Sequence, residues 1–345
     1  MPTAEPAGAS GPLRVLLHLS HAVPAFQPDA RQLAALLPRL APHELTLAGS
    51  DAQFLEALPQ ADAVVVWRFL AEWYARAPRL RRMFTPSAGR EALASDPSGR
   101  VERHFGHFHG PLMAESLLAM IAFMNRRLGD ALLAQAERRW DRAPFSARRR
   151  LSGQVALIVG YGAIGQRCGA LLSALGMVVH ALRRDVRRSS PCAQRVFSPE
   201  QRLEAVAAAD HVVCLLPSDT GTDHFLDAAA FARMSPRACV YNLGRGNAID
   251  AGALIDALAC GRIAGAFLDV VPEEPLPESS PLWRAPNLYL TPHASAIGVA
   301  YLDLYFDELV LELSCRPPEP AAGGPTANAS SASSGASEGP SRGSR

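Results

Sequence analysis

Three side chains that could act together on a carbonyl compound follow apolar, strand-like runs in the second half of the chain. Arg245 stands between two glycines, which let a guanidinium emerge from a tight loop, while Glu274 and His293 lie in proline-containing segments. A guanidinium can bind a carboxylate through two parallel hydrogen bonds and stabilise a developing oxyanion, and an imidazole can donate a proton. The three residues predict a site that reduces a 2-keto acid, in which His293 protonates the carbonyl oxygen and Glu274 favours the charged imidazole.

Each of these residues has a structural alternative when taken alone. Arg245 could be an ordinary loop cation, Glu274 a surface acid in a proline-rich turn, and His293 a capped histidine of the core. For Glu274 alone the surface role is favoured. The functional interpretation depends on all three standing at strand ends of one domain, beside a source of hydride.

A glycine-rich turn between an apolar run and a helical pattern predicts a binding site for the dinucleotide that would supply the hydride. Gly160, Gly162 and Gly165 occupy the three positions of G-x-G-x-x-G. The first permits a tight turn, the second lets a pyrophosphate approach the backbone, and the third lets the helix lie close to the strand. An ordinary glycine-rich turn is the alternative. We expect a strand, a helix and a second strand at residues 155–159, 164–175 and 177–182.

The end of the second strand of this unit bears on the choice of cofactor. An acidic residue there holds the ribose 2′-hydroxyl of NAD, whereas an arginine accommodates the 2′-phosphate of NADP. This chain has Arg183, followed by Arg184. NADP is therefore the preferred cofactor in our prediction and NAD the second choice, unless both arginines are merely solvated and selectivity is slight.

Strand and helix patterns alternate along most of the chain, which predicts an α/β protein with two Rossmann-like domains, each a doubly wound parallel sheet. A last helix at 297–313 follows the nucleotide-binding part, so we expect that domain to be inserted into the substrate domain. The predicted boundaries are a disordered leader at 1–12, a substrate domain at 13–110 and 294–315, a dinucleotide-binding domain at 111–293, and a disordered tail at 316–345.

Composition excludes several other classes of function. A net charge of +1 offers no general attraction for nucleic acid or anionic lipid, and the longest apolar helix candidate, 117–124, is too short to span a bilayer. The cysteines are scattered without a C-x-x-C pair, which is typical of reduced thiols. We expect a cytoplasmic protein without nucleic-acid or membrane partners.

A histidine-rich segment could suggest a metal site. His104, His107 and His109 form H-x-x-H-x-H, but no set of Cys, Asp or Glu ligands lies nearby, and the interleaved phenylalanines favour a packed loop. One of these imidazoles is expected to border a cleft between the domains, because a long helix is predicted next, at 111–127. No metal is predicted.

The order of these motifs resembles the D-isomer-specific 2-hydroxyacid dehydrogenase family, and most of all its glyoxylate/hydroxypyruvate reductase A branch. The similarity rests on Gly-x-Gly-x-x-Gly, Asn-Leu-Gly-Arg-Gly, Asp-Val-x-x-Glu-Glu-Pro-Leu-Pro, Ser-Pro-Leu-Trp and Thr-Pro-His, and covers about residues 13–313. It implies reduction of small 2-keto acids to D-2-hydroxy acids and pairing of two copies through the nucleotide domains, with the helix at 111–127 as the expected contact.

The resemblance also implies roles for individual positions. Arg245 would bind substrate, Glu274 would support the histidine, and His293 would be the acid/base. The backbone of Ser87, Ala88 and Gly89 would bind the substrate carboxylate. Asp269 would contact the nicotinamide amide. The cofactor-binding set expected overall is Gly160, Gly162, Ala163, Ile164, Gly165, Arg183, Arg184, Leu216, Pro217, Thr222, Leu243, Gly244, Asp269 and His293.

The chain departs from the family pattern in two loops. Most members show Gly-Ala-Gly-Val-Asp in the substrate loop, where this chain has residues 87–91, Ser-Ala-Gly-Arg-Glu. Arg90 could reach a second acidic group of the substrate or point to water, and water is favoured. Asp219, in the second loop, would place a carboxylate near the cofactor phosphate or ribose.

Two functional alternatives remain: a nucleotide-sensing scaffold or corepressor, and an NAD-dependent dehydrogenase working oxidatively.

Overall fold

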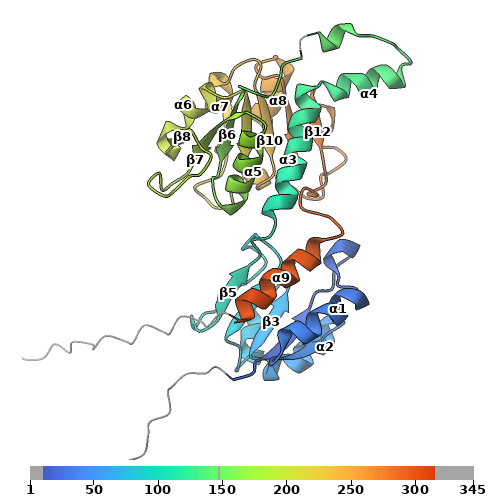
Figure 1. Cartoon of the computed structure of the whole chain (residues 1–345), viewed down its shortest axis with the longest axis vertical. Coiled ribbons are helices and arrows are strands. Elements are labelled where there is room, and N and C mark those ends of the chain that lie inside the picture. The colour runs from blue at the N-terminus through green and yellow to red at the C-terminus, as the bar shows by residue number, and fades with distance from the viewer. Residues whose placement is uncertain (1–10, 147, 315–345) are drawn as a thin grey trace, which may run out of the picture.

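The computed structural model describes residues 11–146 and 148–314, which form two α/β lobes (Figure 1). Within these ranges we find no helix with the length and apolar character that a membrane span requires. The predicted tail lies outside the described residues, as does all of the predicted leader except residues 11 and 12.

The first lobe is built on a parallel sheet with strand order β2-β1-β3-β4-β5. The order reverses between β1 and β3, so the switch point of this sheet lies at the carboxyl ends of these two strands. The strands of this sheet are β1 (Arg14–His18), β2 (Glu44–Leu47), β3 (Ala63–Val66), β4 (Arg82–Thr85) and β5 (Glu102–Phe105), and its helices are α1 (Ala30–Leu36), α2 (Asp51–Ala57) and α9 (Tyr301–Ser314).

The second lobe contains a parallel sheet with strand order β12-β11-β10-β9-β6-β7-β8, which is the order of a dinucleotide-binding sheet with one added strand. Its switch point lies between β6 and β9. The strands are β6 (Val155–Val159), β7 (Val178–Leu182), β8 (Arg195–Phe197), β9 (His211–Cys214), β10 (Cys239–Asn242), β11 (Gly265–Leu268) and β12 (Leu288–Leu290). The helices are α3 (Gly110–Asn125), α4 (Leu128–Ala136), α5 (Ala163–Ala174), α6 (Arg202–Ala207), α7 (Ala228–Arg233) and α8 (Ala251–Ala259).

Two helices connect the lobes. The chain leaves the first lobe through α3 and returns with α9, whose Tyr305 and Phe306 pack in the core beside Val15 and Val65 (Figure 1). The second lobe is thus inserted into the first. The predicted α/β class, with two Rossmann-like parallel sheets and an inserted nucleotide domain, is confirmed, while the residue boundaries proposed above stay a prediction.

Some predicted elements differ from the structure. The last helix begins at Tyr301 instead of residue 297, because the chain first makes turns in which the amide of Ile297 donates to Ala294 and that of Tyr301 to Gly298. The segment with His104 is the edge strand β5 and not a loop. This strand and β8 were missed because neither has the apolar run that marks a central strand: β5 is largely polar, and β8 is only three residues long.

Short 3-10 turns complete the described chain, at Pro24–Phe26, Leu37–Leu40, Leu58–Gln60, Ala71–Arg76, Ala143–Phe145, Pro199–Gln201, Gly246–Ala248 and Pro281–Arg284.

Candidate active site

The glycine-rich turn lies at the switch point of the second sheet and has the geometry that a dinucleotide needs. Gly160 has φ +100°, and a Cβ added to it would lie 2.8 Å from the Leu215 carbonyl oxygen. A Cβ on Gly165 would lie 2.5 Å from the Gly160 oxygen, whereas one on Gly162 would meet nothing within 4 Å. Gly162 is also the N-cap of α5 and leaves the first helical amides without a side-chain cap. Backbone donors therefore face open space, where a pyrophosphate fits.

The other predicted cofactor residues surround this turn. Ala163 and Ile164 begin α5. Leu216 and Pro217 follow β9, and a Cβ on Gly244, which follows β10 and Leu243, would lie 2.6 Å from the Leu216 oxygen. The two loops therefore pack against each other at the carboxyl edge of the sheet.

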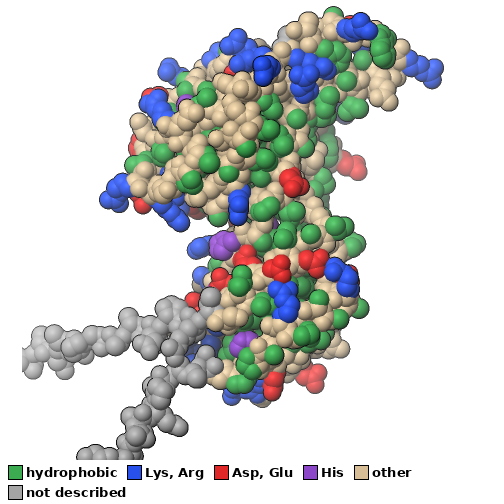
Figure 2. Space-filling view, in the orientation of Figure 1, with side chains coloured by type: hydrophobic (Ala, Val, Ile, Leu, Met, Phe, Trp, Pro, Cys, Tyr) green, Lys and Arg blue, Asp and Glu red, His purple; other side chains and the backbone are tan. Residues whose placement is uncertain are grey.

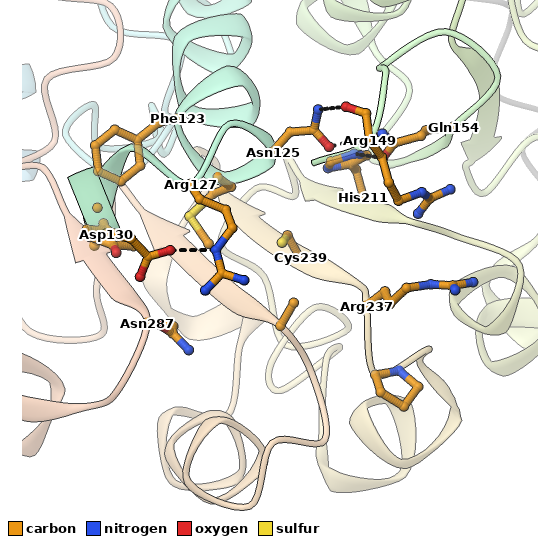
Figure 3. A pocket seen from close by; sticks show the side chains of 15 residues that line it. Phe123, Asn125, Arg127, Asp130, Arg149, Gln154, His211, Arg237, Cys239 and Asn287 are labelled. Carbon is orange, nitrogen blue, oxygen red and sulfur yellow. Dashed lines mark hydrogen bonds and ion pairs between the residues drawn. The ribbon is translucent and has the colours of Figure 1, made fainter. Parts of the chain in front are cut away.

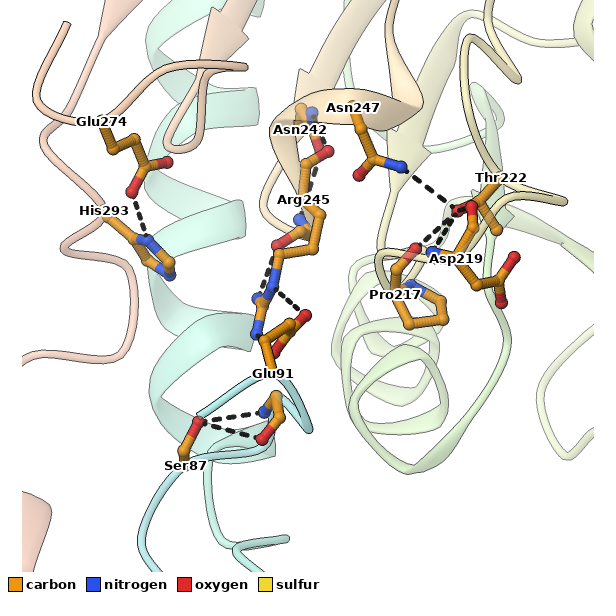
Figure 4. Close-up of polar contacts among 12 residues, drawn as sticks. Ser87, Glu91, Pro217, Asp219, Thr222, Asn242, Arg245, Asn247, Glu274 and His293 are labelled. Atoms are coloured by element: carbon orange, nitrogen blue, oxygen red, sulfur yellow. Dashed lines mark hydrogen bonds and ion pairs between the residues drawn. The ribbon is translucent and has the colours of Figure 1, made fainter. Parts of the chain in front are cut away.

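The turn with Asp219 is held by its own side chains. The Thr222 hydroxyl lies 2.8 Å from the Pro217 oxygen and 2.7 Å from the Asp219 oxygen, and the Asp219 carboxylate accepts a 2.9 Å hydrogen bond from the Gly221 amide (Figure 4). This local bond holds Asp219 in its own turn, and the predicted contact of its carboxylate with the cofactor stays a prediction.

Arg183 and Arg184 follow β7 directly, next to β6 and the glycine-rich turn. The Arg183 guanidinium donates to the Ser189 carbonyl at 3.1 Å and to the Ser190 hydroxyl at 3.2 Å, which fixes its direction. Arg184 is exposed. Both cations thus stand at the strand end where a dinucleotide-binding sheet holds the adenine ribose.

His293 and Glu274 form a hydrogen-bonded pair. His293 Nδ1 lies 2.8 Å from Glu274 Oε2, and the other carboxylate oxygen of Glu274 accepts from the Val271 amide at 3.1 Å (Figure 4). His293 has φ +52°, a left-handed conformation that is uncommon for residues other than glycine. The backbone turn and the carboxylate together direct an exposed imidazole away from the strand end.

Asp269 anchors the segment that carries His293. It is 1% exposed, its backbone oxygen accepts from the His293 amide at 2.8 Å, and its carboxylate accepts from the Thr291 hydroxyl at 2.6 Å. The amides of Ala294 and Ser295 also donate to this carboxylate, at 2.8 Å and 2.9 Å. A buried acid thus fixes residues 291–295 on the end of β11, and its predicted contact with the nicotinamide amide stays a prediction.

Arg245 follows β10 and reaches across to the substrate loop of the first lobe. Its loop is braced by Asn242, whose side chain donates to the Arg245 oxygen at 3.0 Å and accepts from the Gly244 amide at 3.1 Å. The Arg245 guanidinium pairs with Glu91 at 3.1 Å (Figure 4). An arginine in a loop of the second lobe and a carboxylate in a loop of the first lobe therefore form a contact between the lobes.

The substrate loop, residues 87–91, comes just after β4. The Ser87 hydroxyl accepts from the Gly89 amide at 3.1 Å and lies 3.3 Å from the Gly89 oxygen, so the loop is closed on itself around an exposed Ala88. Arg90 is exposed and its guanidinium lies 5.1 Å from the centre of the Phe105 ring. Figure 2 shows that the space between the lobes is hollowed and bordered by basic, acidic and histidine side chains.

The comparison with known proteins agrees with this geometry. A family model described as "D-isomer specific 2-hydroxyacid dehydrogenase, NAD binding domain" matches residues 118–295. The chain belongs to the D-isomer specific 2-hydroxyacid dehydrogenase family. It is accordingly an NAD(P)-dependent oxidoreductase with a nicotinamide cofactor, as the sequence predicted.

Relatives within this dehydrogenase family are similar over most of their length. The glyoxylate/hydroxypyruvate reductase A of Serratia proteamaculans is 30% identical over 246 residues, covering 69% of this chain and 77% of that protein. That of Photorhabdus laumondii is 29% identical over 250 residues, covering 69% and 78%. A 2-hydroxyacid dehydrogenase structure from Aeromonas salmonicida has a TM-score of 0.72 at 29% identity, covering 87% of this chain and 93% of that one. The resemblance to the reductase A branch is confirmed.

One cavity of this dehydrogenase lies at the opposite edge of the nucleotide sheet. It has a volume of about 380 Å³ and is lined by the amino ends of several strands and by Arg127 and Arg149 (Figure 3). These two arginines pair with Asp130 and Asp210. His211, also in its wall, is hydrogen-bonded through both ring nitrogens, and burial lowers its pKa to about 4. None of the predicted catalytic residues lines this cavity.

The histidine-rich segment of the dehydrogenase lies at the junction of the lobes. His109 is buried at the start of α3, its Nε2 lies 3.0 Å from the Tyr301 hydroxyl, and burial lowers its pKa to about 4, so it is neutral near pH 7. Among the described residues no group of three His, Cys, Asp or Glu side chains could hold a metal ion. The His109–Tyr301 contact and the Glu91–Arg245 pair were not predicted, because no local pattern signals contacts between residues more than 150 positions apart.

Proposed function

We propose that this chain uses NADPH to reduce small 2-keto acids of the glyoxylate and hydroxypyruvate type to D-2-hydroxy acids. The observation that supports this most strongly is the His293–Glu274 pair, 2.8 Å apart, in the nucleotide-binding lobe that also carries Arg245. A proton donor, its supporting carboxylate and a guanidinium follow strands of the sheet that carries the cofactor turn (Figure 4). This is the set that reduction of a carbonyl beside a carboxylate requires.

The roles of these residues follow from their chemistry. The bound nicotinamide supplies the hydride. His293 holds a proton on the ring nitrogen opposite Nδ1 and delivers it to the carbonyl oxygen, while Glu274 accepts the Nδ1 hydrogen bond and stabilises the charged ring. Arg245 binds the substrate carboxylate and stabilises the negative charge that develops on the carbonyl oxygen. The backbone of Ser87, Ala88 and Gly89 binds the same carboxylate from the other lobe.

The preference for NADPH is supported by the two arginines after β7. Arg183 is held by Ser189 and Ser190. It stands at the end of β7, where an acidic residue would bind the ribose 2′-hydroxyl of NAD. A 2′-phosphate beside a guanidinium forms charge-assisted hydrogen bonds that NADH cannot form. We expect this difference to contribute about 1.5–3 kcal/mol, or roughly ten-fold or more in affinity.

The test is a spectrophotometric assay of the purified full chain with NADPH or NADH and a panel of short 2-keto acids. We expect oxidation of the reduced cofactor with glyoxylate or hydroxypyruvate, with a KM for NADPH at least ten-fold below that for NADH. The reverse assay, with D-glycerate and NADP or NAD, reports the oxidative direction. No turnover with any acid in either direction would reject the proposed reaction.

We further propose that the chain forms a homodimer through its nucleotide-binding lobes. The segment 128–146, called the arm here, begins with α4, which projects from that lobe (Figure 1). Its Leu132, Leu133 and Trp140 are 59%, 55% and 91% exposed, an apolar set that a second copy could cover. The predicted contact, α3, leads directly into this arm.

Sedimentation of the full chain at micromolar concentration is expected to show a dimer. Replacing Trp140 by alanine should weaken it by about 2 kcal/mol, roughly 30-fold in Kd, because aromatic anchors dominate such interfaces. Trp283→Ala is the matched control, since Trp283 is 55% exposed in the 3-10 turn Pro281–Arg284, outside the arm. A wild-type chain that sediments only as a monomer would contradict the proposal.

A further inference from the structure

Each of the three guanidinium nitrogens of Arg245 has a hydrogen-bond partner within the chain itself. Nε lies 3.1 Å from Glu91 Oε1, Nη2 lies 3.5 Å from Glu91 Oε2, and Nη1 donates to the Gly244 oxygen at 2.9 Å. The two nitrogens on one edge thus face the two oxygens of one carboxylate. This is the two-point arrangement by which an arginine binds a free carboxylate.

The substrate loop leaves no room for a second carboxylate in the same place. A Cβ added to Gly89 would lie 2.0 Å from Nη2 of Arg245 and 2.3 Å from Oε2 of Glu91, so the pair rests directly on the backbone of Gly89. Figure 4 shows Glu91 between the Arg245 side chain and the loop with Ser87. The carboxylate of a substrate held by both Arg245 and this loop would have to take the position of Glu91.

The Glu91–Arg245 ion pair is strong enough to form, and it is exposed enough for another anion to displace Glu91. Burial is the largest single influence on the pKa of Glu91 and would raise it, but the hydrogen bond and charge of Arg245 and hydrogen bonds from backbone amides together lower that pKa below its ordinary value, so Glu91 is ionised near pH 7. The Glu91 side chain is nevertheless 51% exposed and that of Arg245 29%. Ion pairs with this exposure are weak and can be replaced by another anion.

We propose that Glu91 is an internal competitor for the substrate carboxylate and thereby a specificity-determining residue. This inference rests on the proposed function of Arg245 as the carboxylate-binding group. A substrate binds by exchanging its carboxylate for that of Glu91. The released Glu91 side chain remains two residues from Gly89, beside the bound substrate, and its negative charge disfavours a second carboxylate there. Glu91 therefore weakens binding of all 2-keto acids and selects monocarboxylic over dicarboxylic ones.

The decisive variant is Glu91→Gln, which keeps the length of the side chain and removes its charge. We expect about a ten-fold lower KM for glyoxylate, with kcat changed by less than about three-fold and the KM for NADPH unchanged, because the ion pair that the substrate must displace becomes a weaker hydrogen bond from Arg245 to a neutral amide. For 2-oxoglutarate the KM should fall further still. Glu56→Gln, which removes an exposed carboxylate on α2 of the same lobe, is the matched control. It should leave the KM for glyoxylate and the KM for 2-oxoglutarate unchanged.

A binding measurement separates this inference from the proposed reaction. Calorimetry on the NADPH-loaded chain with oxamate, a monoanion, and oxalate, a dianion, requires no turnover. Glu91→Gln should bind oxamate about ten-fold more tightly than the wild type, and oxalate by a larger factor. Absence of turnover with tighter oxamate binding would reject only the proposed reaction. Unchanged or weaker binding in Glu91→Gln would overturn the competitor role, and weaker binding with a lower kcat would show that Glu91 positions Arg245 for catalysis instead.

Discussion

Replacing His293 by asparagine is expected to lower kcat for glyoxylate reduction by about 10³-fold, within the range that general acid catalysis contributes. Asparagine can keep a hydrogen bond to Glu274, which lies 2.8 Å from the imidazole, and it tolerates the left-handed backbone of this position, where φ is +52°. The variant therefore removes the proton donor and leaves the loop and its neighbours in place. The measurement is the single-turnover oxidation of NADPH at saturating substrate.

His224→Asn is the matched control for this experiment. His224 also has a left-handed backbone, with φ +49°, and lies in the same lobe on an exposed turn, 3.9 Å from Asp250. Its replacement should change kcat by less than about two-fold, since surface substitutions away from the site are nearly neutral. NADPH binding should be equal in both variants. A rate for His293→Asn within ten-fold of the wild type would mean that the proton comes from another group.

The structure agrees with the sequence-based predictions where a feature depends on local pattern. The turn with Gly160, Gly162 and Gly165 was assigned because each glycine has a separate steric task, and the structure shows two of them in close backbone contact and the third beside open space. The parallel, doubly wound character of the second sheet was predicted from the alternation of apolar runs and helical patterns. His293 and Glu274 were paired because both follow strands of one parallel sheet, whose carboxyl ends share an edge.

What the sequence could not show are contacts between the lobes. Glu91 was noted only as part of a departure from the family pattern, because nothing near it signals an arginine 154 positions away. Arg90 was assigned to water and is exposed. The position of its guanidinium over the ring of Phe105 was not predicted, because that residue belongs to the edge strand β5, which lacks a strand pattern. The role of Asp269 as an anchor was hidden for a related reason: an acid after a strand looks the same in sequence whether it faces a cofactor or its own chain.

Replacing Asp269 by alanine is expected to destabilise the nucleotide-binding lobe by about 3–5 kcal/mol. The substitution removes the acceptor of the Thr291 hydroxyl and of the Ala294 and Ser295 amides, which now bond to the carboxylate at 2.6–2.9 Å. Ser295 is 7% exposed, so its amide would lose a partner that water cannot easily replace. The measurement is the urea-induced unfolding transition of the full chain without cofactor.

Two variants separate the anchor from the loss of a charge. Asp269→Asn keeps the size of the side chain and one acceptor oxygen, and so should destabilise the lobe less than Asp269→Ala. Asp219→Ala removes a carboxylate that accepts a single hydrogen bond, from Gly221 in an exposed turn, and should cost only about 0.5 kcal/mol. Because the same carboxylate fixes the segment that carries His293, Asp269→Asn should also lower kcat while NADPH still binds. Equal unfolding midpoints for Asp269→Ala and Asp219→Ala would refute the anchoring role, and would leave the position of His293 to its own backbone turn and to Glu274.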